Sequence, residues 1–215
     1  MALLTWFVDF ILHLDRHLTD LVATYQYWVY GILFLIVFAE TGFVVTPFLP
    51  GDSLLFAVGA LAAVDQTGTL NPGYVWILLI VAAFLGNELN YRIGRYVGPR
   101  AFTGKIPGLK REYLLKTQAF YDKHGGKTIV LSRFLPIIRT FAPFVAGIGH
   151  MHYGRFQAFN VAGAATWVVL FIGGGYFFGN IPLVKNNFGL VTVAIIIASL
   201  LPVAWVLLAP KKPTT

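Results

Sequence analysis

Residues 134–149, with the sequence FLPIIRTFAPFVAGIG, decide the fold, and Arg133 directly precedes them. The stretch is apolar enough for a lipid bilayer, but Arg139 lies near its middle, and Pro136 and Pro143 interrupt it. A proline within a helix removes a backbone hydrogen bond and clashes with the preceding turn. A straight transmembrane helix is therefore disfavoured. The pattern predicts a re-entrant hairpin, broken at Pro136 and Pro143, that enters and leaves the membrane on one side.

A second stretch, residues 27–64, has the same character with the opposite charge. It contains two apolar segments that are each about 20 Å long as helices, which is short of the ~30 Å hydrocarbon core. Acidic residues, prolines and a glycine lie between these segments: Glu40, Pro47, Pro50, Gly51 and Asp52. We therefore predict a re-entrant hairpin over 27–64, broken at Pro47, Pro50 and Gly51. It faces the second hairpin, over 128–149.

The composition is that of an integral membrane protein. Of the 215 residues, 57% are hydrophobic and 12% are charged, whereas a soluble domain has about 25% charged residues. Residues 74–93 are apolar enough for one transmembrane helix, and 156–209 for two more. We therefore predict one all-α transmembrane domain over residues 1–215.

Positive charge is concentrated in one part of the chain. The net charge is +7, and nine of the sixteen Lys and Arg residues lie between Arg92 and Lys127. Short basic loops beside membrane spans are typical of the cytoplasmic side. We therefore expect a basic cytoplasmic loop over 94–127 and no nucleic-acid partner. The C-terminus, with Lys211 and Lys212, is then also cytoplasmic.

The N-terminal segment, residues 2–24, has an amphipathic pattern. Its charged or titratable residues recur at spacings of three and four, so they share one helical face: Asp9, His13, Arg16 and Asp20. Leucine and other apolar residues fall mostly on the opposite face. The segment is too polar for a span, and we predict a helix that lies in the membrane interface.

Metal and thiol chemistry find little support. The chain has no cysteine, which excludes disulfides and thiolate metal sites. His150 and His152 are two residues apart, so they would not face each other on a helix, and no convincing third ligand accompanies them. We expect no metal and no cofactor.

Four charges are predicted to lie at membrane depth: Glu40 and Asp52 in the first hairpin, Arg133 and Arg139 in the second. Left unpaired, they would cost on the order of 10 kcal/mol. Arginine forks suit phosphate oxygens, whereas carboxylates can bind and release protons. We predict that Arg133 and Arg139 hold a phosphate group and that Glu40 and Asp52 take part in proton coupling. The alternative is a structural ion-pair network that locks the hairpins together.

Two weaker patterns concern Glu88 and an internal repeat. Glu88 precedes Arg92 by four residues, so the two can pair on one helix face. A helix-end ion pair is the simpler interpretation, and proton coupling is the alternative. Residues 56–60, FAVGA, resemble residues 144–148, FVAGI. With one span between them, the hairpins would open to opposite sides, as in inverted-repeat transporters.

Motifs over nearly the whole chain resemble those of one bacterial family. They are ETG at 40–42, FLPGDSLL at 48–55, YRIGR at 91–95, KHGG at 123–126 and RFLPIIRTFAPFVAG at 133–147. Together they resemble the DedA family of inner-membrane proteins. The resemblance implies two facing re-entrant hairpins, a fold shared with eukaryotic lipid scramblases. It also implies a transporter, with flipping of undecaprenyl phosphate as the leading activity and coupling to the proton-motive force.

The resemblance carries over to the candidate site with one departure. The acidic and arginine positions of the family match Glu40, Asp52, Arg133 and Arg139. Many members, however, have an aspartate where this chain has Asn87, followed here by Glu88. If that aspartate carries protons, Glu88 must substitute from a different helix face, or coupling differs.

We therefore predict an inner-membrane translocase of undecaprenyl phosphate or a related phospholipid, with membrane lipids as its partners. No nucleophile–base motif supports an enzyme. Two alternatives remain: a proton-coupled antiporter of small solutes or drugs, and a scaffold for envelope assembly that transports nothing.

Overall fold

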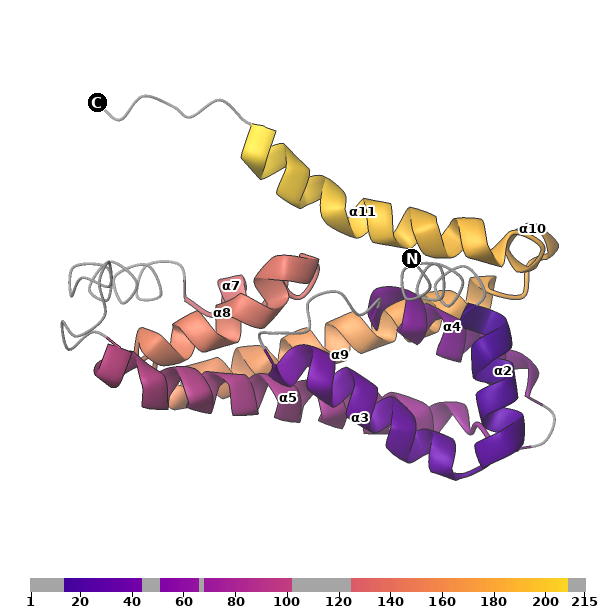
Figure 1. The fold of residues 1–215 in the computed structure, drawn as a ribbon, viewed down its shortest axis with the longest axis horizontal. Coiled ribbons are helices and arrows are strands. Elements are labelled where there is room, and N and C mark those ends of the chain that lie inside the picture. Colours follow the sequence, from indigo (N-terminus) through magenta and orange to yellow (C-terminus); the bar gives the residue numbers. More distant parts are fainter. Residues whose placement is uncertain (1–13, 44–50, 66–67, 102–124, 209–215) are drawn as a thin grey trace, which may run out of the picture.

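The computed structural model describes residues 14–43, 51–65, 68–101 and 125–208, and these ranges form helices joined by short turns. The helices are α2 (Leu14–Tyr25), α3 (Trp28–Gly42), α4 (Gly51–Val64), α5 (Pro72–Ala101), α7 (Lys127–Ser132), α8 (Pro136–Ile148), α9 (Tyr153–Phe178), α10 (Pro182–Lys185) and α11 (Phe188–Leu208) (Figure 1). Four predicted features lie outside the described residues: Pro47, Pro50, residues 2–13 of the interfacial helix and residues 102–124 of the basic loop.

Two long helices form the centre of the molecule. Residues Pro72–Gly98 of α5 and Tyr153–Phe178 of α9 are each long and apolar enough to cross a membrane. Helix α5 extends to Ala101, so the predicted loop starts later than residue 94. Close packing against α8 accounts for this difference, because Gly94 and Gly98 let the two backbones approach.

The predicted hairpins correspond to pairs of short helices. In the first pair α3 has 15 residues and α4 has 14. In the second pair α7 has 6 residues and α8 has 13. The chain is extended at Phe43 and at Leu135, where a helix ends or begins. These lengths suit helices that enter a bilayer without crossing it, although the depth of each hairpin remains a prediction.

The two prolines of the second hairpin have different positions. Pro136 is the first residue of α8, where a missing N–H costs nothing. The prediction that Pro143 breaks the hairpin is wrong, because Pro143 lies inside α8. Membrane helices tolerate proline when neighbouring helices satisfy the backbone. Pro143 cannot donate to the carbonyl of Arg139, and Asn90 of α5 donates a hydrogen bond of 2.6 Å to the next carbonyl, that of Thr140.

The two halves of the helical bundle, α3–α5 and α7–α9, pack against each other. Helix α3 packs on α5, and α7 packs on α9, so the first helix of each hairpin lies against the long helix of its own half. The second helices are exchanged: α4 packs on α9, and α8 packs on α5. Both hairpins are therefore held by both long helices.

The two exchanged interfaces use matching contacts, in which a glycine faces a backbone carbonyl so closely that a Cβ atom would overlap it. The pairs are Gly175 with Phe56 and Gly59 with Ile172 between α4 and α9, and Gly94 with Phe144 and Gly147 with Tyr91 between α5 and α8. Residues 56–60 and 144–148, which resemble each other in sequence, thus make the same kind of contact, one with α9 and the other with α5.

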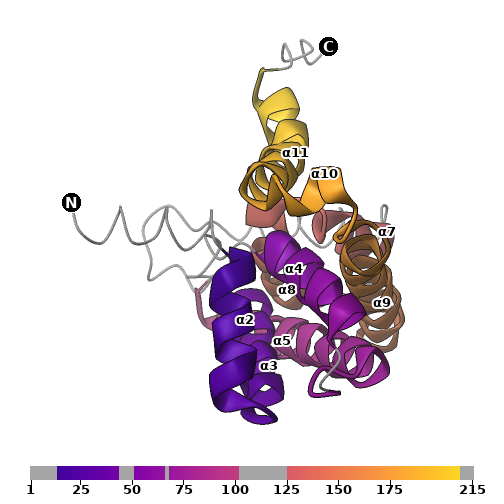
Figure 2. The same cartoon turned by 90° about the vertical axis from the view of Figure 1, so that its right-hand side faces the viewer.

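The outer helices are amphipathic or apolar. In α2, Leu18 is buried while Arg16 and Asp20 are exposed, which agrees with the predicted amphipathic pattern. Helix α11 lies to one side of the other helices (Figure 2) and touches α4, where the ring centroids of Phe56 and Phe188 are 6.0 Å apart.

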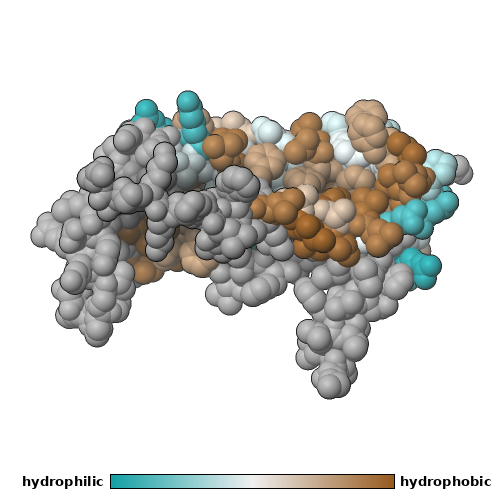
Figure 3. Space-filling model, turned by 90° about the horizontal axis from the view of Figure 1, so that it is seen from above, coloured by the Kyte–Doolittle hydropathy of each residue, from teal (hydrophilic) through white to brown (hydrophobic). Residues whose placement is uncertain are grey.

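The surface formed by the residues that the structure describes is largely apolar. Figure 3 shows hydrophobic side chains gathered over one face, with hydrophilic groups near its edges. Large apolar side chains are exposed on several helices, including Leu35, Ile77, Leu170 and Leu190. Contiguous apolar surface of this kind marks contact with a membrane or a partner, and together with the two long apolar helices it fits a membrane protein.

Candidate functional site

Arg139 forms the centre of a buried ion-pair cluster. Its Nη1 lies 2.7 Å from Oδ1 of Asp52 at the start of α4, and its Nη2 lies 3.2 Å from Oε1 of Glu40 in the last turn of α3. All three residues are buried. Each terminal nitrogen of one guanidinium therefore holds a different carboxylate, and the cluster joins the first hairpin to the second. We call these three residues the Arg139 cluster.

Trp167 of α9 completes this cluster. Its Nε1 donates a hydrogen bond of 2.8 Å to Oδ1 of Asp52, and its ring centroid lies 5.4 Å from Cζ of Arg139. The tryptophan is fully buried. It supplies a donor to the carboxylate and an aromatic face to the cation. Our sequence analysis did not identify Trp167, because its partners lie far away in the chain.

Gly51 provides the space for Glu40. A Cβ atom at position 51 would overlap the carboxyl group of Glu40. Helix α4 begins at Gly51, so Asp52 lies in its first turn. A carboxylate there is favoured by the helix dipole. The local sequence Gly51–Asp52 therefore both admits one carboxylate and presents the other to Arg139.

Arg133 lies in a different environment. It is 2% exposed and occupies the turn between α7 and α8. Its Nη2 donates to Oδ1 of Asn160 at 2.7 Å and to the carbonyl of Ala83 at 3.2 Å. Within the described residues it pairs with no carboxylate, and its Nε has no hydrogen-bond partner. Arg133 is therefore a buried cation whose contacts are neutral oxygens.

The two arginines are neighbours with separate contacts. Their positive charges are close enough to repel each other, although the carboxylates contact Arg139 and not Arg133. We predicted that all four charged residues meet in one site. The structure brings Glu40, Asp52 and Arg139 together and leaves Arg133 beside them without a carboxylate.

Asn90 of α5 connects the two hairpins at this level. Its Nδ2 donates to the carbonyl of Thr140 at 2.6 Å and to the carbonyl of Thr41 at 3.4 Å. Thr41 follows Glu40 in the chain, and Thr140 follows Arg139. One fully buried amide thus fixes the backbone next to both members of an ion pair. An asparagine in an apolar helix was the available sequence signal.

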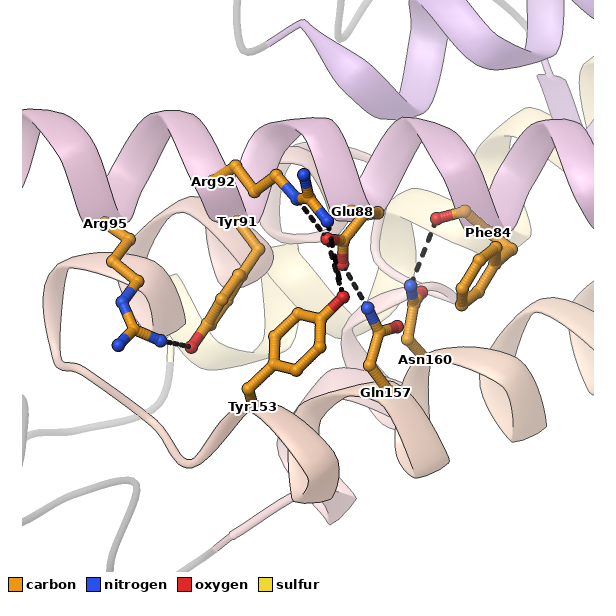
Figure 4. Close-up of polar contacts among 8 residues, drawn as sticks. All are labelled: Phe84, Glu88, Tyr91, Arg92, Arg95, Tyr153, Gln157 and Asn160. Atoms are coloured by element: carbon orange, nitrogen blue, oxygen red, sulfur yellow. Dashed lines mark hydrogen bonds and ion pairs between the residues drawn. The ribbon is translucent and has the colours of Figure 1, made fainter.

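Glu88 belongs to a second polar cluster, between α5 and α9 (Figure 4). It pairs with Arg92, as predicted, accepts a hydrogen bond of 3.0 Å from Tyr153 and also contacts Gln157. The Arg92 side chain is 68% exposed, so the cluster reaches the surface. Glu88 faces α9 and is not part of the Arg139 cluster, which favours an ion pair with a structural role. The pair does not lie at a helix end as predicted, because α5 continues to Ala101.

Comparison with known proteins identifies a matching family model and several relatives of this chain. The VTT domain matches residues 49–177. Protein DedA of Escherichia coli K12 is 57% identical over 203 residues, which cover 94% of this chain and 92% of the relative. An uncharacterized membrane protein of Mycobacterium tuberculosis H37Rv is 41% identical over 173 residues, covering 80% and 75%. No solved structure matches the chain significantly.

A more distant relative extends the comparison. Inner membrane protein YqjA of Escherichia coli K12 is 36% identical over 155 residues, which cover 72% of this chain and 69% of the relative. The VTT match includes Asp52, Arg133, Arg139 and Trp167, while Glu40 lies just before it. With the two long apolar helices and the high identity over nearly the whole length, the chain is a membrane protein of the DedA family.

Proposed function

We propose that this protein translocates a lipid phosphate, undecaprenyl phosphate or a related phospholipid, across the bacterial inner membrane. The observation that carries the proposal is Arg133, a buried guanidinium near a second buried arginine; among the described residues its hydrogen-bond partners are neutral oxygens. A buried charge without a partner is costly. A phosphate group between the two arginines would supply the missing negative charge, and arginine forks suit its oxygens.

The Arg139 cluster offers a way to couple protons to this movement. It contains two carboxylates and one guanidinium, so a proton bound by Glu40 or Asp52 would weaken one ion pair. Arg139 could then exchange a carboxylate for a phosphate oxygen. Release of the proton would favour the carboxylate again and expel the phosphate. In this mechanism protons and substrate compete for one guanidinium.

The hairpins provide the movement that translocation needs. Because Arg139 and its carboxylates come from different hairpins, loss of an ion pair loosens the contact between them. The exchanged packing of α4 on α9 and α8 on α5 gives each half an equivalent partner. Such symmetry is typical of transporters that alternate around a fixed site. The polyprenyl chain would stay in the bilayer while the phosphate crosses.

The proposed orientation follows the charges and the relatives. The basic residues 92–127 would lie in the cytoplasm, together with the C-terminus. One relative is named an inner membrane protein, which supports the same membrane here. We propose no catalytic activity, and the substrate would leave the protein chemically unchanged.

A proton-coupled antiporter of cationic solutes is the second candidate. Two carboxylates beside the indole of Trp167 could hold an organic cation if Arg139 moved away, because an aromatic face attracts cations. This mechanism gives Arg133 no role.

A scaffold for envelope assembly is the remaining alternative. It would need the Arg139 cluster only to hold the helices together.

The test is transport in proteoliposomes that contain undecaprenyl phosphate. We expect wild-type protein to speed its appearance in the opposite leaflet and a pH gradient to change the rate. Arg133→Ala and Arg139→Ala should each abolish the activity. Arg155→Ala replaces an exposed arginine outside the site and should leave it unchanged. Folded wild-type protein that moves no lipid with or without a gradient would exclude the proposal; proton-driven efflux of a cationic dye would then favour the antiporter.

A further inference from the structure

The central helices form two packing units that do not coincide with the two hairpins. Helices α3 and α8 both pack on α5, and helices α4 and α7 both pack on α9. We call α3, α5 and α8 the α5 unit, and α4, α7 and α9 the α9 unit. Each unit therefore contains one helix of each hairpin. The second hairpin passes from one unit to the other at the turn between α7 and α8, where Leu135 has an extended backbone.

Contacts inside each unit bring helix backbones close together. In the α5 unit, a Cβ atom at Gly42 of α3 would lie 3.3 Å from Cα of Gly86 in α5, and Gly94 of α5 faces the backbone of α8. In the α9 unit, Gly59 of α4 and Gly175 of α9 each face the backbone of the other helix. Small residues allow membrane helices to pack in this close way. Helices that are packed so closely are expected to move as one body.

Contacts between the units depend on side chains, many of them polar. Helices α5 and α9 form the main contact, which is less extensive than the packing of α8 on α5 or of α4 on α9. Among the described residues no glycine–backbone contact joins α5 to α9. Instead Glu88 accepts hydrogen bonds from Tyr153 and Gln157, and Asn160 donates to the carbonyl of Phe84 (Figure 4), together with contacts between aromatic rings. Interfaces of limited size and mixed polarity permit relative movement.

The Arg139 cluster is divided between the two units. Arg139 lies in α8 and Glu40 in α3, both in the α5 unit, whereas Asp52 lies in α4 of the α9 unit. Trp167 of α9 donates its hydrogen bond to Asp52 inside the α9 unit. The ion pair between Asp52 and Arg139, at 2.7 Å, therefore crosses the boundary, and the pair between Glu40 and Arg139, at 3.2 Å, does not. The two carboxylates are thus not equivalent.

We propose that the α5 unit and the α9 unit move relative to each other, and that the Asp52–Arg139 ion pair holds them together in this structure. When this ion pair opens, Glu40 moves with Arg139 and balances its charge, while Asp52 keeps its hydrogen bond to Trp167. Arg133, which contacts both α5 and α9, lies at the boundary. Each hairpin bends between its two helices and does not move as a whole. The inference rests on the proposed function only for the purpose of the movement.

The test measures distances between spin labels by double electron–electron resonance in the purified full-length protein. The chain contains no cysteine, so introduced cysteines can be labelled specifically. Three pairs at exposed positions are compared: Leu35→Cys with Ile77→Cys inside the α5 unit, Val64→Cys with Leu170→Cys inside the α9 unit, and Ile77→Cys with Leu170→Cys between the units. The two pairs inside the units are the matched controls for the third.

Asp52→Asn removes the charge that crosses the boundary and keeps an oxygen that can accept from Trp167. It should shift the 77–170 distance by more than ~2 Å, the size of a rearrangement of packed elements, and leave the 35–77 and 64–170 distances unchanged. Glu40→Gln leaves Arg139 paired with Asp52, so it should shift none of the three distances. Equal shifts in the two variants, or a shift inside either unit, would overturn the division into these units. An unchanged 77–170 distance in folded Asp52→Asn protein would overturn the role of the ion pair.

A second measurement covers the case in which Asp52→Asn does not fold. With no further substitution, the distribution of the 77–170 distance should be broader than the other two, because only this pair spans the boundary. Three equally narrow distributions would overturn the inference. None of these measurements requires transport. Units that separate in a protein that moves no lipid would contradict the proposed function alone, and fixed distances in a protein that moves lipid would contradict this inference alone.

Discussion

Arg133 and Arg139 lie six residues apart and are both almost completely buried, yet their surroundings differ. Arg139 contacts two carboxylates and the ring of Trp167, which come from three other helices. Arg133 contacts an asparagine and a backbone carbonyl. The comparison teaches that one residue type in one short motif can have two roles. Arg139 holds the two hairpins together, and Arg133 presents a positive charge that no carboxylate in the described residues balances.

The largest loss of stability is expected for Arg139→Leu. The substitution would leave Glu40 and Asp52 buried without a cation, and removing one partner of a buried pair costs about 3–5 kcal/mol. The free energy of unfolding, measured by denaturant titration in detergent, should fall by that amount. Adding Glu40→Gln and Asp52→Asn to the Arg139→Leu variant removes the two unpaired negative charges and should restore part of the lost free energy of unfolding. A loss below about 1 kcal/mol for the single variant would show that the cluster does not hold the hairpins together.

A smaller loss is expected for Arg139→Lys. In the wild-type protein the two carboxylates contact separate nitrogens of the guanidinium. A lysine keeps the positive charge but has one nitrogen in place of the guanidinium fork. We expect about 2 kcal/mol in unfolding free energy and at least a tenfold slower lipid movement in proteoliposomes. A scaffold that needs only the charge would tolerate the change. Wild-type transport in the lysine variant would therefore count against a phosphate site at Arg139.

Trp167→Phe separates the hydrogen bond in the Arg139 cluster from the aromatic packing. The phenyl ring retains apolar contact but cannot donate to Asp52, and a hydrogen bond to a charged group contributes about 1.5–3 kcal/mol. We expect a loss of about 1.5 kcal/mol in unfolding free energy. Trp76→Phe is the matched control, since Nε1 of Trp76 has no partner among the described residues. Equal losses in both variants would assign the effect to packing alone.

Sequence patterns predicted much of the architecture. The apolar runs gave the long helices α5 and α9, and the half-length segments between polar breaks gave α3, α4 and α8. Charged residues within apolar stretches correctly indicated Glu40, Asp52 and Arg139 as a buried group. These features depend on local hydropathy and on the high cost of burying a charge, both of which can be judged from a short window.

The rest depends on contacts between distant residues. Pro143 looked like a break, but packing of α8 along α5 keeps the helix continuous. Trp167 carries no local signal that distinguishes it from ordinary helix residues. Asn90 stands out as an asparagine in an apolar helix, but this signal does not indicate its partners, the carbonyls of Thr41 and Thr140. The separation of Arg133 from the carboxylates arises from Asn160, 27 positions away, and from the carbonyl of Ala83, 50 positions away. Local patterns identified the charged residues, and tertiary packing determined which of them pair.

The smallest loss of stability, with a complete loss of transport, is expected for Arg133→Leu. Within the described residues this substitution removes a buried charge and leaves no carboxylate unpaired, and replacing such a charge with an apolar residue is often neutral. The lost hydrogen bonds to Asn160 and Ala83 limit the expected cost to about 1 kcal/mol. Lipid movement should nevertheless fall to the background rate, because the variant cannot balance the phosphate charge.

This pairing of effects is opposite to that of Arg139→Leu, which is expected to lose stability and transport together. Measuring the free energy of unfolding and the rate of lipid movement for Arg133→Leu and Arg139→Leu therefore tests directly whether the two arginines have different roles. If Arg133→Leu destabilises the protein as much as Arg139→Leu does, Arg133 has a structural role, and the buried charge no longer argues for an anionic substrate. If it is stable and still transports lipid, the phosphate must bind elsewhere. A stable, inactive Arg133→Leu protein is the result that only a substrate-binding arginine explains.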